Sequence, residues 1–201
     1  MAEKPTIEIF RRKDAEDFTK ALSDSESRTA VGSGAAMTAA VAAAYLRRAA
    51  ALTAAELPEN ERVQYIERNS EILRGYMVRL IDEDVKCRGP LRRAIKENDE
   101  RAIEAAHQPA VAITQEIVCM MTQCLDLADE LAGFAAGESR TYIATAAELA
   151  MGAIRAAIRY TVDMSRECTD ETYRFVIRRE NEMTLEQYTP VFESIRSRTA
   201  E

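Results

Sequence analysis

The segment that follows Pro58 carries an aspartate where a helical apolar stripe predicts a core-facing side chain. The apolar positions recur at helical spacing, at Ile66, Leu73, Met77 and Leu80. At about 100° per residue, Asp84 falls in the middle of this stripe and Asp82 falls on the opposite face. A carboxylate that faces a core must be paired, hydrogen-bonded or protonated, so Asp84 is a candidate acid or base. The alternative is that the helix has reached the end of a bundle at Asp84, where water hydrates the side chain.

A glycine turn, Val31-Gly32-Ser33-Gly34, stands before a segment in which alanine dominates, with thirteen alanines between residues 30 and 55. Alanine is the strongest helix former and has little side chain to bury, so this helix suits close approach by another backbone or by a ligand. The turn is expected to leave free N–H groups at a helix N-terminus, which favours an anion. Gly32, Ser33 and Gly34 are therefore candidate ligand contacts, and tight helix packing is the alternative.

Other polar side chains give weaker indications. Asn69 lies at the edge of the Asp84 stripe, where a structural hydrogen bond explains it. Arg155 and Arg159 lie one turn apart and either pair with Glu148, bind an anionic ligand or belong to a solvated face. Three tyrosines either stack on a flat ligand or lie at core edges: Tyr45, Tyr142 and Tyr160.

Composition narrows the function classes. The 201 residues carry a net charge of −7, which argues against nucleic-acid binding. The alanine segment is broken by Arg47 and Arg48, and neither a transmembrane run nor a signal-peptide core is recognised, which predicts a cytoplasmic protein without membrane attachment. Four cysteines without a CxxC pair and one histidine, His107, argue against a metal site and predict reduced thiols.

Nearly the whole chain has helical periodicity, and it contains only seven glycines and five prolines. No strand alternation persists, so we expect an all-α bundle of about seven helices in one domain over residues 1–201. The first three helices are expected over 15–23, from the glycine turn to about 57, and from Pro58 to about 88. After a break at Gly89-Pro90, two more are expected over 91–106 and from Pro109 to 132. The last two are expected from a cap at Ser139 to about 166, and from a capping box at Thr184 and Gln187.

Two of these helices carry stripes suited to bundle packing. The helix after Pro109 has a heptad-like seam formed by Ile113, Ile117, Met120, Cys124, Leu127 and Leu131. The helix after Ser139 has a stripe of small residues at the same spacings, Ala146, Ala150, Ala153 and Ala157. The first stripe predicts an apolar core, and the second predicts close contact with another helix.

The order of these features over residues 8–175 resembles the formiminotetrahydrofolate cyclodeaminase / methenyltetrahydrofolate cyclohydrolase family. The family's Pro-Gly-Gly-Gly-Ser turn is similar to Val31-Gly32-Ser33-Gly34-Ala35. Its Asp-Asp-Val-Glu-Ala-Phe segment is similar to residues 83–88, in which Asp84 is kept and Arg88 replaces the phenylalanine. A long helix ending Asp-Glu-Leu-Ala at residues 129–132, a loop and a small-residue helix follow in the same order.

Elsewhere the chain departs from the family pattern. The family has a Gly-Lys-Lys-Lys-Tyr run after the alanine helix, but residues 52–61 contain no lysine. Its Ser-Asp-Ala-Gly segment aligns with residues 140–143, so Thr141 replaces the aspartate, and its later Asn-Val aligns with Arg159-Tyr160. The resemblance thus implies Asp84 as the catalytic residue and Gly32, Ser33, Gly34, Arg88, Thr141 and Arg159 as the ligand-binding set.

The resemblance implies a homodimer that binds a tetrahydrofolate derivative as substrate, with no tightly bound cofactor. Family members either expel ammonia from 5-formimino-tetrahydrofolate or interconvert 5,10-methenyl- and 10-formyl-tetrahydrofolate. Both reactions need a positioned acid or base. With the lysines and the late aspartate replaced, two alternatives stay open. Either new groups such as Arg159, Glu148 and Arg88 support the chemistry, or the chain is a non-catalytic dimer that binds another ligand or serves as a scaffold.

Overall fold

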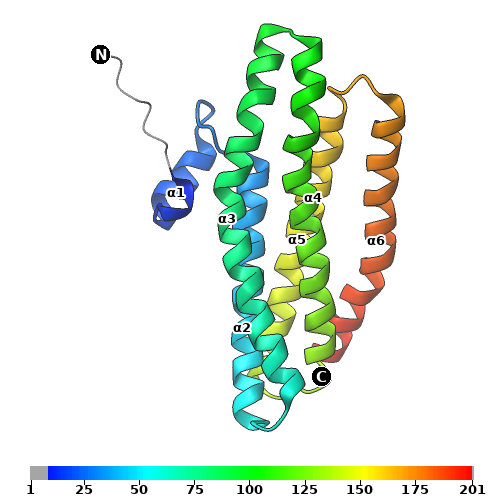
Figure 1. Ribbon diagram of the computed structural model, residues 1–201. Helices are drawn as coiled ribbons and strands as arrows, with labels where there is room; N and C mark the ends of the chain where they lie inside the picture. Colours follow the sequence, from blue (N-terminus) through cyan, green and yellow to red (C-terminus); the bar gives the residue numbers. More distant parts are fainter. Residues whose placement is uncertain (1–8, 201) are drawn as a thin grey trace.

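The computed structural model describes residues 9–200, and in that range the fold is entirely helical (Figure 1). A short 3-10 turn, η1 (Phe10–Arg12), precedes six α-helices: α1 (Ala15–Ser23), α2 (Val31–Glu56), α3 (Glu61–Glu97), α4 (Glu100–Leu131), α5 (Glu138–Ser165) and α6 (Glu171–Thr199). The all-α prediction is confirmed, with six α-helices in the described range where about seven were expected.

Helices α2 to α5 form the central bundle, and each runs antiparallel to the one before it (Figure 1). Helix α2 packs against α3 and α5, and α4 packs against the other sides of α3 and α5. Helix α6 covers α4 and α5, whereas α1 lies at the edge of the bundle beside α2 and α3 (Figure 1). The start of α2 is therefore close to the end of α5.

The two small-residue segments pack against each other, as their stripes predict. Helices α2 and α5 are in extensive contact, and the predicted α5 stripe is fully buried, namely Ala146, Ala150, Ala153 and Ala157. Near the start of α5, the ring of Tyr142 stacks on the ring of Tyr45 from α2, with centroids 6.0 Å apart. The seam of α4 is also confirmed, with Ile117, Cys124 and Leu131 fully buried. Small side chains thus bring α2 close to α5 along the groove described below.

The predicted break at Gly89-Pro90 is wrong, because α3 continues through Pro90 to Glu97. A proline inside a helix removes one backbone hydrogen bond. Here the next turn buries Leu91 and Ala94, and this packing holds the helix together. The chain instead breaks at Asn98, whose φ of 53° lies in the left-handed region. Pro109 likewise lies inside α4 rather than at its start.

Three further predicted helix starts are wrong. Pro58 lies in the turn before α3, which begins at Glu61 after the Asn60 cap. Helix α5 begins after Gly137, which has a φ of 54°, and the Ser139 hydroxyl donates to the Ala136 carbonyl instead of capping the helix. Helix α6 begins at Glu171, where the Asp170 side chain accepts the Tyr173 N–H at 3.0 Å. Thr184 therefore lies inside α6, because an aspartate cap further upstream starts the helix first.

Within residues 9–200, one helix, α4, is long and apolar enough to cross a membrane, with a mean hydropathy of 1.2 in its most apolar window. Half of this window is buried inside the bundle. Core helices of helical bundles meet the same criterion, so the finding is weak evidence for a membrane span.

Candidate functional site at the start of α2

Asp84 is fully buried, so the core-facing interpretation of the α3 stripe is confirmed and the solvated-end alternative is wrong. Its Oδ2 accepts two hydrogen bonds from Ser33, one from the N–H at 2.9 Å and one from the hydroxyl at 2.8 Å. Its Oδ1 is buried and has no hydrogen-bond partner among the described residues. One oxygen is therefore fixed, and the other is available for a further donor or a proton.

Burial raises the pKa of the Asp84 carboxyl above its usual value. The Ser33 hydroxyl, the charge of Arg88 and the Ser33 N–H act in the opposite direction, but burial is the largest effect. A carboxyl group whose pKa is raised by desolvation can hold a proton closer to neutral pH, as a general acid or base must.

The expected glycine turn is not a separate turn, because Val31 already begins α2 and Gly32, Ser33 and Gly34 form its first turn. Ala30 is the N-cap residue and supplies no side-chain cap. The Asp84 carboxylate, on the neighbouring helix, takes the place of a capping side chain by accepting the third amide of α2. The anion predicted at this helix N-terminus is thus in part a side chain of the protein itself.

Gly32 makes this cap possible. A Cβ atom at residue 32 would lie 2.1 Å from Asp84 Oδ1 and 2.5 Å from its Cγ, far inside van der Waals contact. At Gly34 the nearest atoms to a Cβ would be the Leu22 methyl carbons at 3.8 Å, an ordinary contact. Of these two glycines, only Gly32 is required by the approach of Asp84 to the α2 backbone.

Arg88 lies one turn after Asp84 on α3 and contacts Tyr160 of α5. Its Cζ lies 5.0 Å from the centre of the Tyr160 ring, a cation–π arrangement. Arg88 Nη1 and the Tyr160 hydroxyl are both buried without a hydrogen-bond partner in the described part of the chain. Burial raises the pKa of Tyr160 to about 12. The sequence predicts Arg88 as a ligand contact, whereas it marks Tyr160 only as one of three tyrosines and as the residue aligned with the valine of the family's Asn-Val. The other two tyrosines, Tyr45 and Tyr142, stack on each other away from this site.

An open groove of about 650 Å³ lies over this site. Its lining comes from the loop before α2, from α1, and from facing positions of α2, α3 and α5: Leu22, Ala30, Val31, Gly34, Ala35, Thr38, Arg88, Gly152, Ala153, Ala156 and Tyr160. The walls are mostly small or apolar, and the polar groups gather at the end where α2 begins and α5 finishes. Asp84 lies behind this wall, next to Arg88, and has no exposed surface of its own.

The structure does not bring Thr141 and Arg159 to this site. Thr141 is exposed in the first turn of α5, next to Tyr142, whose ring stacks on that of Tyr45 in the middle of α2. Arg159 is exposed and pairs with Asp163, with Nε 2.8 Å from Oδ2, so its guanidinium is engaged outside the groove lining. In one chain, these two side chains therefore do not join Asp84, Ser33 and Arg88.

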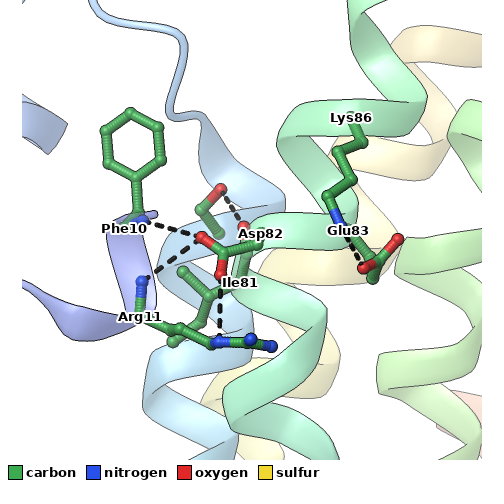
Figure 2. Close-up of polar contacts among 7 residues, drawn as sticks. Phe10, Arg11, Ile81, Asp82, Glu83 and Lys86 are labelled. Carbon is green, nitrogen blue, oxygen red and sulfur yellow. Dashed lines mark hydrogen bonds and ion pairs between the residues drawn. The ribbon is translucent and has the colours of Figure 1, made fainter. Parts of the chain in front are cut away.

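Asp82 is the buried acid that sequence reasoning missed. It falls on the opposite face of α3 as predicted, yet it is only 6% exposed because η1 covers it. Figure 2 shows its carboxylate accepting the N–H groups of Phe10 at 2.7 Å and Arg11 at 3.3 Å and pairing with the Arg11 guanidinium. Every contact comes from a segment more than 70 residues away, so no local pattern could reveal it.

Other candidates have structural partners. Glu148 pairs with Arg196 of α6, and the Asn69 amide donates to the Tyr65 carbonyl within its own helix. His107 contacts the Met164 carbonyl, and the Cys168 thiol donates to Glu104. Residues 9–200 contain no group of three His, Cys, Asp or Glu side chains arranged to hold a metal ion.

A family model matches most of this chain, and a solved structure shares its fold. Residues 14–182 match the family described as Formiminotransferase-cyclodeaminase. The fold is similar to the crystal structure of formiminotetrahydrofolate cyclodeaminase from Thermotoga maritima, with a TM-score of 0.85 and 18% sequence identity. That match covers 94% of this chain and 96% of the Thermotoga maritima chain. A comparison with curated proteins found no match.

Proposed function

Because this chain belongs to the formiminotransferase-cyclodeaminase family, we propose that it is a one-carbon enzyme acting on a tetrahydrofolate derivative, with Asp84 as its acid or base. The reaction is either methenyltetrahydrofolate cyclohydrolysis or formiminotetrahydrofolate cyclodeamination. The observation that carries the proposal is the state of Asp84, which is buried, has Oδ2 fixed by Ser33 and has no partner for Oδ1 in the described part of the chain.

Each reaction has a step that suits this carboxyl group. In cyclodeamination an amine must be protonated as it leaves, and in cyclohydrolysis a water must lose a proton as it attacks the methenyl carbon. A carboxyl with a raised pKa serves either step, because a pKa closer to the working pH lets the group both accept and return a proton. Ser33 fixes the orientation by holding Oδ2, which leaves Oδ1 for the proton.

The reacting group has to reach Oδ1, which is now enclosed by its neighbours. Arg88 lines the groove and its charge acts on Asp84, so we propose that a ligand reaches the carboxyl from the Arg88 side and not through the α2 backbone, which lies against Oδ1 at Gly32. We propose that the protein acts as a cytoplasmic homodimer, with no tightly bound cofactor and no nucleic-acid or membrane partner. The separation of Thr141 from Asp84 supports a dimer, because a second subunit could complete a site that one chain leaves open.

The test is a spectrophotometric assay of the loss of methenyl-tetrahydrofolate absorbance, measured against spontaneous hydrolysis across neutral pH. We expect acceleration proportional to protein, and a loss of about 100-fold or more in Asp84→Asn. The matched control is Glu83→Gln, which alters a neighbouring, half-buried acid paired with Lys86. Formimino-tetrahydrofolate deamination is assayed with the same variants. A wild-type rate in a folded Asp84→Asn protein would exclude Asp84 as the acid or base.

A second function, a non-catalytic dimer that binds a ligand in the same groove or serves as a scaffold, is favoured by one observation. Asp84 has no exposed surface, and neither Thr141 nor Arg159 joins it. Tight binding of a reduced folate without turnover of either substrate would select this function. The two proposals therefore differ in turnover, and binding alone does not separate them.

A further inference from the structure

The groove over the start of α2 ends on two buried polar atoms whose hydrogen bonds are unmade within residues 9–200. They are Nη1 of Arg88 and the hydroxyl oxygen of Tyr160. A buried polar group without a partner costs about 1–3 kcal/mol, and more when it is charged. Both residues line the groove, so a ligand in it can supply the missing partners.

Both groups act as donors, which specifies the chemistry of the missing partner. A guanidinium has no acceptor, and a phenol with a pKa of about 12 keeps its proton at physiological pH. The N-cap residue Ala30 and the first residue of α2, Val31, line the same end of the groove, where α2 contributes the positive end of a helix dipole. The partner that fits is an oxygen that carries negative charge.

The net charge of the site limits how much negative charge a ligand can bring. Arg88 supplies one positive charge, and the buried Asp84 carboxyl lies close enough to interact with it. Arg92 lies nearby, but its Nη1 already donates to the Ser27 carbonyl. A planar carboxylate matches one guanidinium in charge and in shape, whereas a phosphate dianion places two charges on the one group that meets Arg88. A second carboxylate of the same ligand can stay in the open part of the groove, where water hydrates it.

We propose that the Arg88–Tyr160 end of the groove binds the carboxylate of an organic ligand whose apolar or aromatic part lies along the α5 wall. That wall consists of Gly152, Ala153 and Ala156, which present little side chain and leave room for a flat group. The inference rests on the proposed function for the identity of the ligand, since the glutamyl-benzoyl part of a folate has this chemistry. The subsite itself is defined by the two donors and the groove.

Asp84 and Arg88 have opposite effects on such a carboxylate. Removing the Arg88 charge takes away its main partner, so Arg88→Met should weaken binding. Asp84 lies one turn before Arg88 on α3, and its negative charge repels the ligand carboxylate. Asp84→Asn removes this repulsion, so it should tighten binding while it abolishes turnover. A general loss of folding would weaken binding in both variants, and opposite changes therefore identify the local effect.

The experiment is titration calorimetry of the full chain with p-aminobenzoyl-glutamate and with its neutral diamide. We expect the carboxylate to bind at least about tenfold more tightly than the diamide, as a charge-assisted hydrogen bond implies. Arg88→Met should abolish this preference and Tyr160→Phe should reduce it. The control is Lys86→Met, which removes a positive charge on the exposed side of α3, where Lys86 pairs with Glu83 (Figure 2).

Three outcomes would overturn the subsite: no detectable binding of the carboxylate, equal binding of carboxylate and diamide, or unchanged binding by folded Arg88→Met. Inorganic phosphate that displaces the carboxylate with the same dependence on Arg88 would also contradict the assignment to carboxylates. Failure of the proposed function gives a different result. If the protein binds the carboxylate in an Arg88-dependent way but does not turn over a folate, the proposed subsite is supported and the proposed enzymatic function is contradicted.

Discussion

Two aspartates of α3, two positions apart, are both buried but differ in what surrounds them. Asp82 accepts two backbone N–H groups and pairs with a guanidinium, all from η1 (Figure 2). From residues 9–200, Asp84 accepts two hydrogen bonds on one oxygen and none on the other. Burial alone therefore does not identify a functional carboxylate, because the number of unmet hydrogen bonds separates a structural acid from a reactive one.

The covers over the two acids also differ. Asp82 is covered by a three-residue turn at the edge of the bundle, held there by Phe10, which is 1% exposed. Asp84 is covered by the backbone of α2, which is packed between α3 and α5. We expect the first cover to detach locally and the second to move only with the core.

The largest effect is expected where the α2 backbone approaches Asp84. Gly32→Ala places a methyl group 2.1 Å from Oδ1, so we expect a loss of about 3 kcal/mol in the free energy of unfolding. Gly34→Ala has room, and it should instead stabilise the helix by up to about 1 kcal/mol. Urea denaturation of the two variants measures the difference. Equal stabilities would mean that the contact between Gly32 and Asp84 is easily relaxed.

A smaller effect is expected at the other acid. Asp82→Ala leaves the buried N–H of Phe10 without its partner, which costs about 2 kcal/mol. The exposed Arg12 should also become a faster site of tryptic cleavage, since η1 loses its anchor on α3. Glu83→Ala, which removes only a partly exposed pair with Lys86, should change stability by less than about 0.5 kcal/mol. If the two variants are cleaved at the same rate, Asp82 does not hold η1.

The smallest expected effect is a pH dependence that comes from Asp84. Its pKa is raised in the folded protein, so as pH rises above the ordinary aspartate range the unfolded chain loses this proton first. The stability that the protonated carboxyl contributes is complete below that range and is lost as pH rises through the folded pKa. Melting temperatures measured from pH 4 upward should therefore fall for the wild type relative to Asp84→Asn. Parallel curves would contradict a raised pKa at this residue.

Much of the fold could be predicted because its signals are local and repeat along the chain. Helical spacing identified the stripe that buries Asp84, the seam of α4 and the alanine contact of α5. Boundaries were less predictable. Pro90 and Pro109 resemble helix boundaries in sequence, but the residues after each proline are buried, and their packing stabilises a continuous helix. Thr184 has the spacing of a capping box, but Asp170 starts the helix upstream.

The candidate site was predictable only in part, for a physical reason. Sequence alone determined that Asp84 faces the core and that glycines stand at the start of an alanine helix, because both follow from helical geometry and propensity within one segment. Only the tertiary structure decided that Asp84 caps α2, that Arg88 meets Tyr160, that η1 covers Asp82 and that Thr141 lies elsewhere. These contacts depend on how helices pack, and packing is set by side chains spread over the whole chain.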